Sequence, residues 1–154
     1  MKREIERKFL VRDSRWREGA RGENCRQGYL STDIDRTVRV RVMGERAYLT
    51  IKGRSAGSVR AEYEYPIPVE DAAYLLENLC LRPLVEKIRF VVDFAGKMWV
   101  VDVFSGENEG LVLAEIELQD PAEAIEMPEW AGKEVTGDSR FENVSLVARP
   151  YSKR

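Results

Sequence analysis

The stretch EIERK (residues 4–8) alternates charged residues with others in a way that suits a β-strand. Alternate residues of a strand share a face, so Glu4, Glu6 and Lys8 would form one row while Ile5 lies on the opposite face. Two carboxylates and one amine would then stand side by side. The stretch therefore predicts a strand with an ionic face, whose partners must come from elsewhere in the chain.

The same alternation recurs along the sequence. In RVRV (residues 39–42) two arginines share one face and two valines the other, and in AEIEL (residues 114–118) two glutamates stand opposite Ile116 and Leu118. A single strand of this kind usually turns its charged face to water, but that interpretation is hard to sustain for so many strands. The residues on these ionic faces are Glu4, Glu6, Lys8, Arg39, Arg41, Lys52, Glu62, Glu64, Lys87, Arg89, Asp102, Glu115 and Glu117.

Period-two alternation and β-branched or aromatic residues predict eight strands. Turn sequences such as MGER (residues 43–46) and FAGK (residues 94–97) favour antiparallel hairpins between them. The predicted strands span residues 3–11, 25–31, 36–43, 46–53, 59–67, 85–94, 97–104 and 111–119.

Helices are predicted at three places. PVEDAAYLLENLC (residues 68–80) is amphipathic and has acidic residues in its first turn. Asp120 followed by Pro121 resembles a helix start, and a further helix would begin at Asp138 and end at Pro150. The fold class is therefore α+β, dominated by one antiparallel sheet, and residues 1–154 are expected to form a single domain.

The ionic face has two arrangements open to it. An open sheet with helices on its apolar side would leave the charges in water. Eight strands closed into a barrel would instead turn the charges inward, where there is room for side chains or one small ligand. A dry bore is excluded, because burying one ion costs several kcal/mol while a whole domain is stable by roughly 5–15 kcal/mol. We expect an eight-stranded antiparallel β-barrel with a hydrophilic tunnel and helices packed outside.

The composition excludes several classes of function. The 154 residues contain no histidine, which removes Ser-His-Asp and Cys-His catalysis and histidine-ligated metals. Lys and Arg number 25 against 27 Asp and Glu, whereas a general nucleic-acid binder would be basic overall. Cys25 and Cys80 have no CxxC spacing and predict neither a disulfide framework nor a zinc site. Neither a membrane-length apolar run nor a signal-peptide core is visible, so we expect a cytoplasmic protein without nucleic-acid or membrane partners.

The mixture of charges indicates the chemistry of a ligand. Arginine forks and lysine amines suit the oxygens of an extended polyanion. Carboxylates, the remaining candidate ligands, suit Mg²⁺ or Mn²⁺. A linear triphosphate with its divalent cation needs both groups. Neither GxxxxGK[ST] nor GxGxxG occurs, so strand side chains rather than a glycine-rich loop would bind the phosphates.

An ordered set of short motifs extends this interpretation over nearly the whole chain. It runs EIERKFLV, RQGYL, RVRV, LTIKG, EYEYPIPVED, EKIR, VDVF, AEIEL and GKEVTGDSRFEN. The set, with its ExExK signature, resembles the CYTH family of triphosphate tunnel metalloenzymes, and most of all its compact bacterial inorganic triphosphatases. The resemblance implies an eight-stranded tunnel with a C-terminal plug helix and Mg²⁺- or Mn²⁺-dependent hydrolysis.

The resemblance also implies roles for individual residues. The expected triphosphate ligands are Lys8, Arg39, Arg41, Lys52, Lys87, Arg89 and, in the tail, Arg140. The expected metal ligands are Glu4, Glu6, Glu115 and Glu117, with Asp102 as a further candidate. The expected catalytic residues are Glu4, Glu6, Lys8, Lys52, Glu62, Glu64 and Tyr29.

Several of these roles have an alternative. Glu62 and Glu64 would either orient the cations or help to activate water. Tyr29 would either face the tunnel or pack in the core. Arg140 would reach phosphate or carry an ordinary solvated charge. Trp16 and the other two tryptophans are expected to be packing residues.

Our leading hypothesis is a metal-dependent triphosphatase that converts tripolyphosphate and water to pyrophosphate and phosphate. A nucleoside or thiamine triphosphatase, or a class IV-type adenylyl cyclase, is the alternative on the same scaffold. A non-catalytic polyphosphate-binding module is a third hypothesis, against which the full acidic set argues. The expected partner is a small linear triphosphate. A homodimer is left open, since no sequence feature bears on the oligomeric state.

Overall fold

The structure, a computed structural model, describes residues 2–154 and contains one closed antiparallel β-barrel. Around the barrel the order is β5-β4-β3-β2-β6-β7-β8-β1, and pairing of β1 with β5 closes the ring. The predicted eight-stranded barrel is therefore confirmed. Its strands, with the additional β9, are β1 (Arg3–Val11), β2 (Arg21–Ser31), β3 (Thr37–Met43), β4 (Arg46–Lys52), β5 (Val59–Pro66), β6 (Val85–Phe94), β7 (Lys97–Phe104), β8 (Val112–Glu117) and β9 (Ala131–Glu134).

Two features of the sheet differ from the sequence prediction. Strand β2 begins at Arg21 rather than at residue 25, because its first residues pair with β6 although they lack apolar alternation. Strand β9 (AGKE) was not predicted, since four residues of mixed polarity carry no strand signal. It forms through its neighbour: Val11 of β1 is paired with Ala131.

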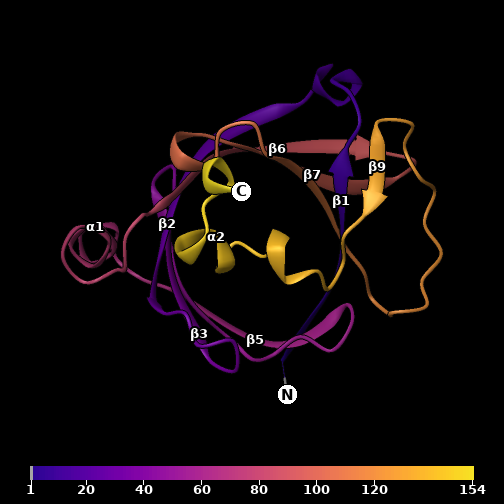
Figure 1. The fold of residues 1–154 in the computed structure, drawn as a ribbon. Helices are drawn as coiled ribbons and strands as arrows, with labels where there is room; N and C mark the ends of the chain where they lie inside the picture. The colour runs from indigo at the N-terminus through magenta and orange to yellow at the C-terminus, as the bar shows by residue number, and fades with distance from the viewer. Residues whose placement is uncertain (1) are drawn as a thin grey trace.

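One long helix and five short ones accompany the strands. The predicted amphipathic helix is confirmed as α1 (Val69–Asn78), which lies outside the barrel (Figure 1) and buries Ala72 and Leu76 against β3 and β4. The short helices are η1 (Arg15–Arg17), η2 (Gly106–Asn108), η3 (Ser139–Phe141), α2 (Ser145–Ala148) and η4 (Tyr151–Lys153).

The predicted helix after Asp120 is wrong. The Asp120 carboxylate does accept a hydrogen bond from the backbone N–H of Ala122, but the chain then turns instead of continuing as a helix. Glu123 accepts the backbone N–H of Gln119 and pairs with Lys97 of β7, which draws this segment along the rim of the barrel. Pro128 follows too closely for a helix of ordinary length.

The C-terminal segment covers one end of the barrel (Figure 1). The single helix predicted from Asp138 to Pro150 is broken into η3 and the one-turn α2, because Glu142 between them is extended. Leu146 and Val147 of α2 are buried with Tyr29 in one apolar cluster at this end. The predicted plug is present, as an irregular segment rather than as a continuous helix.

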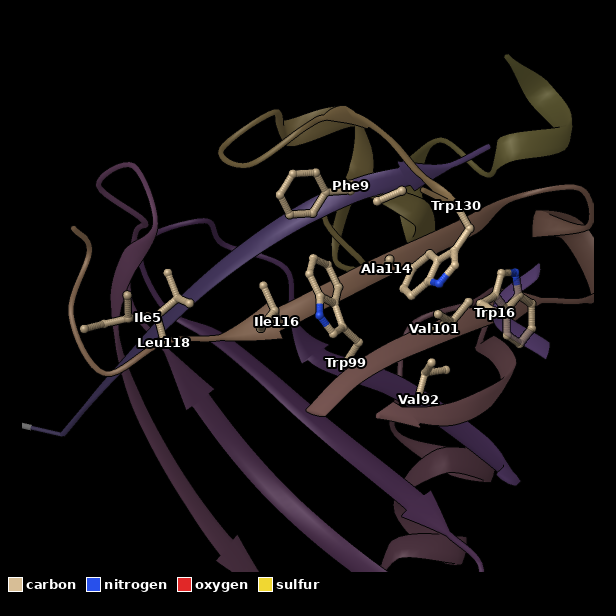
Figure 2. Packing of buried hydrophobic residues seen from close by; sticks show 11 residues of the cluster. Ile5, Phe9, Trp16, Val92, Trp99, Val101, Ala114, Ile116, Leu118 and Trp130 are labelled. Carbon is tan, nitrogen blue, oxygen red and sulfur yellow. The ribbon is translucent and has the colours of Figure 1, made fainter. Parts of the chain in front are cut away.

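Apart from the cluster around Tyr29 and the plug, the apolar core lies outside the barrel wall, since the charges occupy the inward positions. Figure 2 shows one cluster on the outer faces of β1, β7 and β8, in which Phe9 and Trp130 both contact Trp99, with ring centroids 5.6 and 5.5 Å apart. Trp16 belongs to the same cluster and packs on Phe90. All three tryptophans are buried, which confirms them as packing residues. In residues 2–154 no helix is long and apolar enough to cross a membrane.

Candidate functional site

The barrel encloses a cavity of about 480 Å³ that most of the predicted site residues line. The exceptions are Asp102, which is fully buried against Lys87 and Arg89, and Arg140, which is exposed and paired with Asp138 on the surface. The predicted residues that line the cavity are Glu4, Glu6, Lys8, Tyr29, Arg39, Arg41, Lys52, Glu62, Glu64, Lys87, Arg89, Glu115 and Glu117.

Strand register places the ionic rows of β1 and β8 next to each other. Across these strands Glu6 is paired with Glu117 and Lys8 with Glu115. Because inward and outward positions alternate, the whole ionic row of each strand enters the cavity once one member does. The period-two pattern in the sequence thus becomes two neighbouring ionic rows on the inner face of the wall.

Strands β3, β4 and β5 contribute two parallel rows across the cavity wall. In the first, Arg39 is paired with Thr50, which is paired with Glu64. The Glu64 carboxylate accepts a hydrogen bond from the Thr50 hydroxyl at 2.8 Å and lies 3.4 Å from the Arg39 guanidinium. In the second row Lys52 is paired with Glu62, and its amine lies 3.1 Å from that carboxylate. Both glutamates therefore orient cations in this structure.

Three cations gather where β3 and β6 lie on either side of β2. Lys87, Arg89 and Arg41 lie on β6 and β3, and the buried Asp102 of β7 pairs with the first two, its oxygens 2.8 Å from Lys87 Nζ and from Arg89 Nε. Burial alone would raise the pKa of Asp102, but the charges of Arg89 and Lys87 outweigh it and lower that pKa to about 2. Asp102 is thus the counter-ion of Lys87 and Arg89, two candidate phosphate ligands. To bind a metal ion, its carboxylate would have to release both of these cations.

The remaining carboxylates form the acidic half of the cavity. Burial and the neighbouring charges of Glu115 and Glu4 raise the pKa of Glu6 well above its usual value. Glu6 lies near Glu115 and Glu4 near Glu62, so that the carboxyl groups of each pair influence each other's pKa. Carboxylate oxygens are the ligands that Mg²⁺ and Mn²⁺ prefer, so this oxygen-only donor set fits either cation.

The acids are not yet gathered as a finished metal site. Across residues 2–154, no cluster of three or more Cys, Asp or Glu side chains could already hold a metal ion. Glu4 explains this, because its carboxylate is engaged by Lys52 Nζ at 3.1 Å and by Arg60 Nε at 3.3 Å. Metal binding would require at least one of these cations to turn elsewhere, and a phosphate chain offers Lys52 a new partner.

The plug contributes groups that the sequence prediction missed. The Asn143 side-chain oxygen accepts hydrogen bonds from Lys87 Nζ at 2.8 Å and from Gln27 at 3.0 Å, and Gln27 in turn accepts one from Arg41 Nε at 2.9 Å. Lys8 Nζ donates to the backbone oxygen of Phe141 at 3.1 Å. The plug therefore fixes three cations of the cavity. These contacts depend on tertiary packing, and no local pattern would have found them.

Tyr29 has both of the roles foreseen for it. It lines the cavity at the plug end and is also a member of the apolar cluster beneath α2. Its position follows from Gly28, where a Cβ would lie only 2.8 Å from the Cβ of Cys80 and 2.7 Å from Leu84. Only glycine lets β2 pass this close to Cys80 and Leu84, which explains the glycine before Tyr29 in RQGYL.

Arg60 is a further cavity residue that the sequence prediction missed, although the alternation along its strand could have indicated it. It stands two positions before Glu62, on the same face of β5, and lines the cavity. Lys97 and Glu123 also line the cavity, at the end away from the plug. Glu123 lies in an irregular segment, and Lys97 begins β7 outside the inward row of Met98, Val100 and Asp102, so alternation could not have indicated either residue.

The fold and the site define a β-barrel protein whose tunnel is lined by both acidic and basic side chains. This chain belongs to the CYTH family, since the CYTH domain matches residues 2–151. An inorganic triphosphatase of Acetivibrio thermocellus is 51% identical over 151 residues, 98% of this chain and 97% of that protein. One of Nitrosomonas europaea is 38% identical over 149 residues, 94% and 96% of the two chains.

Solved structures share the same fold. The crystal structure of the inorganic triphosphatase NE1496 is similar with a TM-score of 0.64 at 35% identity, over 93% of this chain and 96% of that one. A putative adenylyl cyclase from Hippeastrum, HpAC1, described as having a dominant triphosphatase activity, gives a TM-score of 0.61 at 12% identity. That match covers 77% of this chain and 80% of the other, and it bears on the fold alone.

Proposed function

We propose that the protein hydrolyses inorganic tripolyphosphate to pyrophosphate and phosphate inside the barrel, with Mg²⁺ or Mn²⁺ as cofactor. The observation that carries this proposal is that acidic and basic side chains line one cavity of about 480 Å³. The chain's relatives in Acetivibrio thermocellus and Nitrosomonas europaea are named inorganic triphosphatases, which supports the same activity.

The basic wall binds and orients the phosphate chain. Arg39, Arg41 and Lys87 are nearly buried, so their charges act on a ligand with little screening by solvent. Phosphoryl transfer depends mostly on positioning and on stabilising charge that develops on phosphate oxygens. These side chains supply both, and the plug, through Asn143 and Gln27, holds two of them in place before the ligand arrives.

The acidic wall serves the divalent cation and the water. Glu4, Glu6, Glu115 and Glu117 would hold the cation, which supplies charge neutralisation on the phosphate oxygens when bound. Glu62 lies beside Lys52 in the same cavity, where it can orient the amine or accept a proton from the attacking water. The reaction breaks one phosphoanhydride bond and transfers the terminal phosphoryl group to that water.

The experiment is a phosphate-release assay on the purified protein with tripolyphosphate and either cation. Wild-type protein is expected to release one phosphate and one pyrophosphate per substrate. Lys52→Ala and Glu6→Gln are expected to lower kcat/KM by at least about 100-fold, on the scale of one lost electrostatic group. Arg46→Ala, which removes an exposed arginine paired with Glu23, is the matched control. Wild-type protein that leaves every linear triphosphate intact would overturn the proposal.

An organic triphosphate is the second candidate. At the end of the cavity away from the plug, the inward row of β7 becomes apolar, with Val100 and the exposed Met98 lining it. An apolar group attached to a triphosphate would find contact surface there. Product analysis with ATP separates the cases: ADP and phosphate indicate a nucleoside triphosphatase, and cyclic AMP with pyrophosphate indicates a cyclase.

Three further expectations stay predictions. The chain would work as one domain over residues 1–154, in the cytoplasm, and a homodimer is a state that size measurement in solution would test. Cell fractionation checks the compartment.

A further inference from the structure

The barrel wall has a seam along one edge of β1. Residues Arg3–Ile5 pair with β5, and the same strand pairs with β9 at Phe9 and Val11. Between Ile5 and Phe9, within the part of the chain that the structure describes, this edge has no ladder partner. It is bridged by backbone hydrogen bonds from Glu6 N to Ser58 O and from Val135 N to Lys8 O, and by one from Lys8 N to the Thr136 hydroxyl. The seam runs beside the ionic row of the ExExK stretch.

A second, small cavity lies at this seam. Its volume is about 30 Å³, and Glu4, Glu6 and Lys8 line it as they line the main cavity. Arg60 and Glu142 are likewise common to both cavities. The seam therefore brings the side chains of the candidate metal site close to the interruption in the strand pairing of β1.

Arg60 joins the two sides of the seam. It is the cross-strand partner of Glu4, and its guanidinium donates to Glu4 through Nε at 3.3 Å and to Glu142 of the plug through Nη1 at 3.0 Å. Glu142 also accepts a hydrogen bond from the Ser55 hydroxyl at 3.3 Å. All three charged side chains are largely buried, with exposed fractions of 16% for Arg60, 13% for Glu4 and 11% for Glu142.

These contacts separate the tasks of the two cations that hold Glu4. Lys52 contacts Glu4 and Glu62 in the main cavity and is a candidate phosphate ligand, so it has reason to leave Glu4 when the substrate binds. Arg60 has carboxylates on both edges of its guanidinium and has no such reason. Its ion pair with Glu142 also cancels its charge, so Arg60 can orient Glu4 without repelling a divalent cation nearby.

We propose that Arg60 is a positioning residue that fixes the Glu4 carboxylate for the divalent cation, and that Glu142 of the plug holds and neutralises Arg60. This inference rests on the proposed function in that it assigns Glu4 to the cation. The plug is thereby part of the metal site, although none of its residues would bind the metal directly.

The test removes the pair without changing the net charge. The double variant is Arg60→Met with Glu142→Gln, and electron paramagnetic resonance measures Mn²⁺ binding to the substrate-free protein. We expect the Mn²⁺ affinity to fall about 10-fold, as when a metal ligand loses the side chain that hydrogen-bonds it. The KM for tripolyphosphate at saturating Mn²⁺ is expected to stay within about twofold. Arg60→Lys keeps the positive charge but loses the forked guanidinium, so its Mn²⁺ affinity is expected to lie between those of the wild type and the double variant.

The matched control is Arg7→Met with Glu134→Gln. This pair also starts on β1, is 2.7 Å long and lies outside the cavity, and its loss is expected to leave Mn²⁺ affinity unchanged. Thermal unfolding reports whether each variant is folded. If the double variant is not folded, the Mn²⁺ affinity of Arg60→Lys tests the inference instead. Unchanged Mn²⁺ affinity in folded variants would overturn the inference, as would a KM raised 10-fold or more with unchanged Mn²⁺ affinity. Mn²⁺ binding needs no turnover, so failure of the proposed function would be visible separately, as wild-type protein that binds Mn²⁺ but releases no phosphate.

Discussion

Asp102 lies between Lys87 and Arg89 and forms an ion pair with each, its oxygens 2.8 Å from Lys87 Nζ and from Arg89 Nε. The side chains of Asp102 and Lys87 are almost fully buried, and Arg89 lies at the cavity surface. A single carboxylate thus allows two cations to stand together in the basic wall, where alone they would repel each other.

Replacing Asp102 should expose this dependence. Asp102→Asn keeps the shape of the side chain but leaves the buried Lys87 without its counter-ion and Arg89 with Glu115 alone, at 3.9 Å. We therefore expect the free energy of unfolding to fall by on the order of 3 kcal/mol. Urea denaturation at neutral pH measures the loss. Asp93→Asn on the exposed face of β6 is the control, with an expected change within about 0.5 kcal/mol. Equal stability of the two variants would contradict the account.

The same carboxylate predicts a loss of stability in acid. The pKa of Asp102 is about 2 in the folded protein against 3.8 ordinarily, so its ionised form stabilises the fold fully above the ordinary pKa. That contribution is lost as the pH falls from about 5 to about 2, and a shift of this size corresponds to about 2 kcal/mol. The difference in unfolding free energy between wild type and Asp102→Asn should shrink over this range. A difference that stays constant would be evidence against the lowered pKa.

Lys87 predicts an alkaline limit for substrate binding. Burial, together with the charges of Arg89 and Arg41, lowers the pKa of Lys87 to about 8 despite Asp102. The free protein therefore loses this positive charge as the pH rises through about 8, and kcat/KM for tripolyphosphate should fall there. Lys87→Arg keeps its charge at higher pH, so its profile should lack this limb while showing a lower maximum. A wild-type profile that stays flat to pH 10 would be the contrary result.

Glu6 predicts that metal binding releases protons. Its pKa is raised well above the usual value, chiefly by burial and then by Glu115 and Glu4, so the carboxyl retains a proton that a divalent cation must displace. Mn²⁺ affinity should rise with pH on the acid side of neutrality. Calorimetric titrations in two buffers of different ionisation enthalpy measure the protons released, and Glu6→Gln should release fewer and bind Mn²⁺ more weakly. Identical proton release from both proteins would contradict the role of Glu6.

The sequence predicted the barrel well because inward and outward positions alternate strictly, so each ionic row identified one strand and one face. The candidate cavity residues Lys52, Glu62 and Glu115 followed from this alternation and lie where it predicts. Asp102 shares the pattern but does not line the cavity, because it is buried against Lys87 and Arg89. Alternation cannot separate a residue that lines a tunnel from one that supports it.

What the sequence did not predict depends on contacts between distant segments. Strand β9 exists because the edge of β1 is free beyond Ile5, and the break in the C-terminal helix places Glu142 and Asn143 against Arg60 and Lys87. Neither partner's local sequence contains this information.

In the proposed reaction, carboxylates of the cavity hold the cation while its lysines and arginines hold the phosphate chain. The most direct test is a crystal structure with Mn²⁺ and a non-hydrolysable imido analogue of tripolyphosphate, using the anomalous signal of manganese. The account predicts manganese bound to carboxylates of the group Glu4, Glu6, Glu115 and Glu117, and phosphates in contact with Arg39, Arg41 and Lys87. Manganese and phosphate bound on the outer surface of the barrel, with the cavity unchanged, would contradict it.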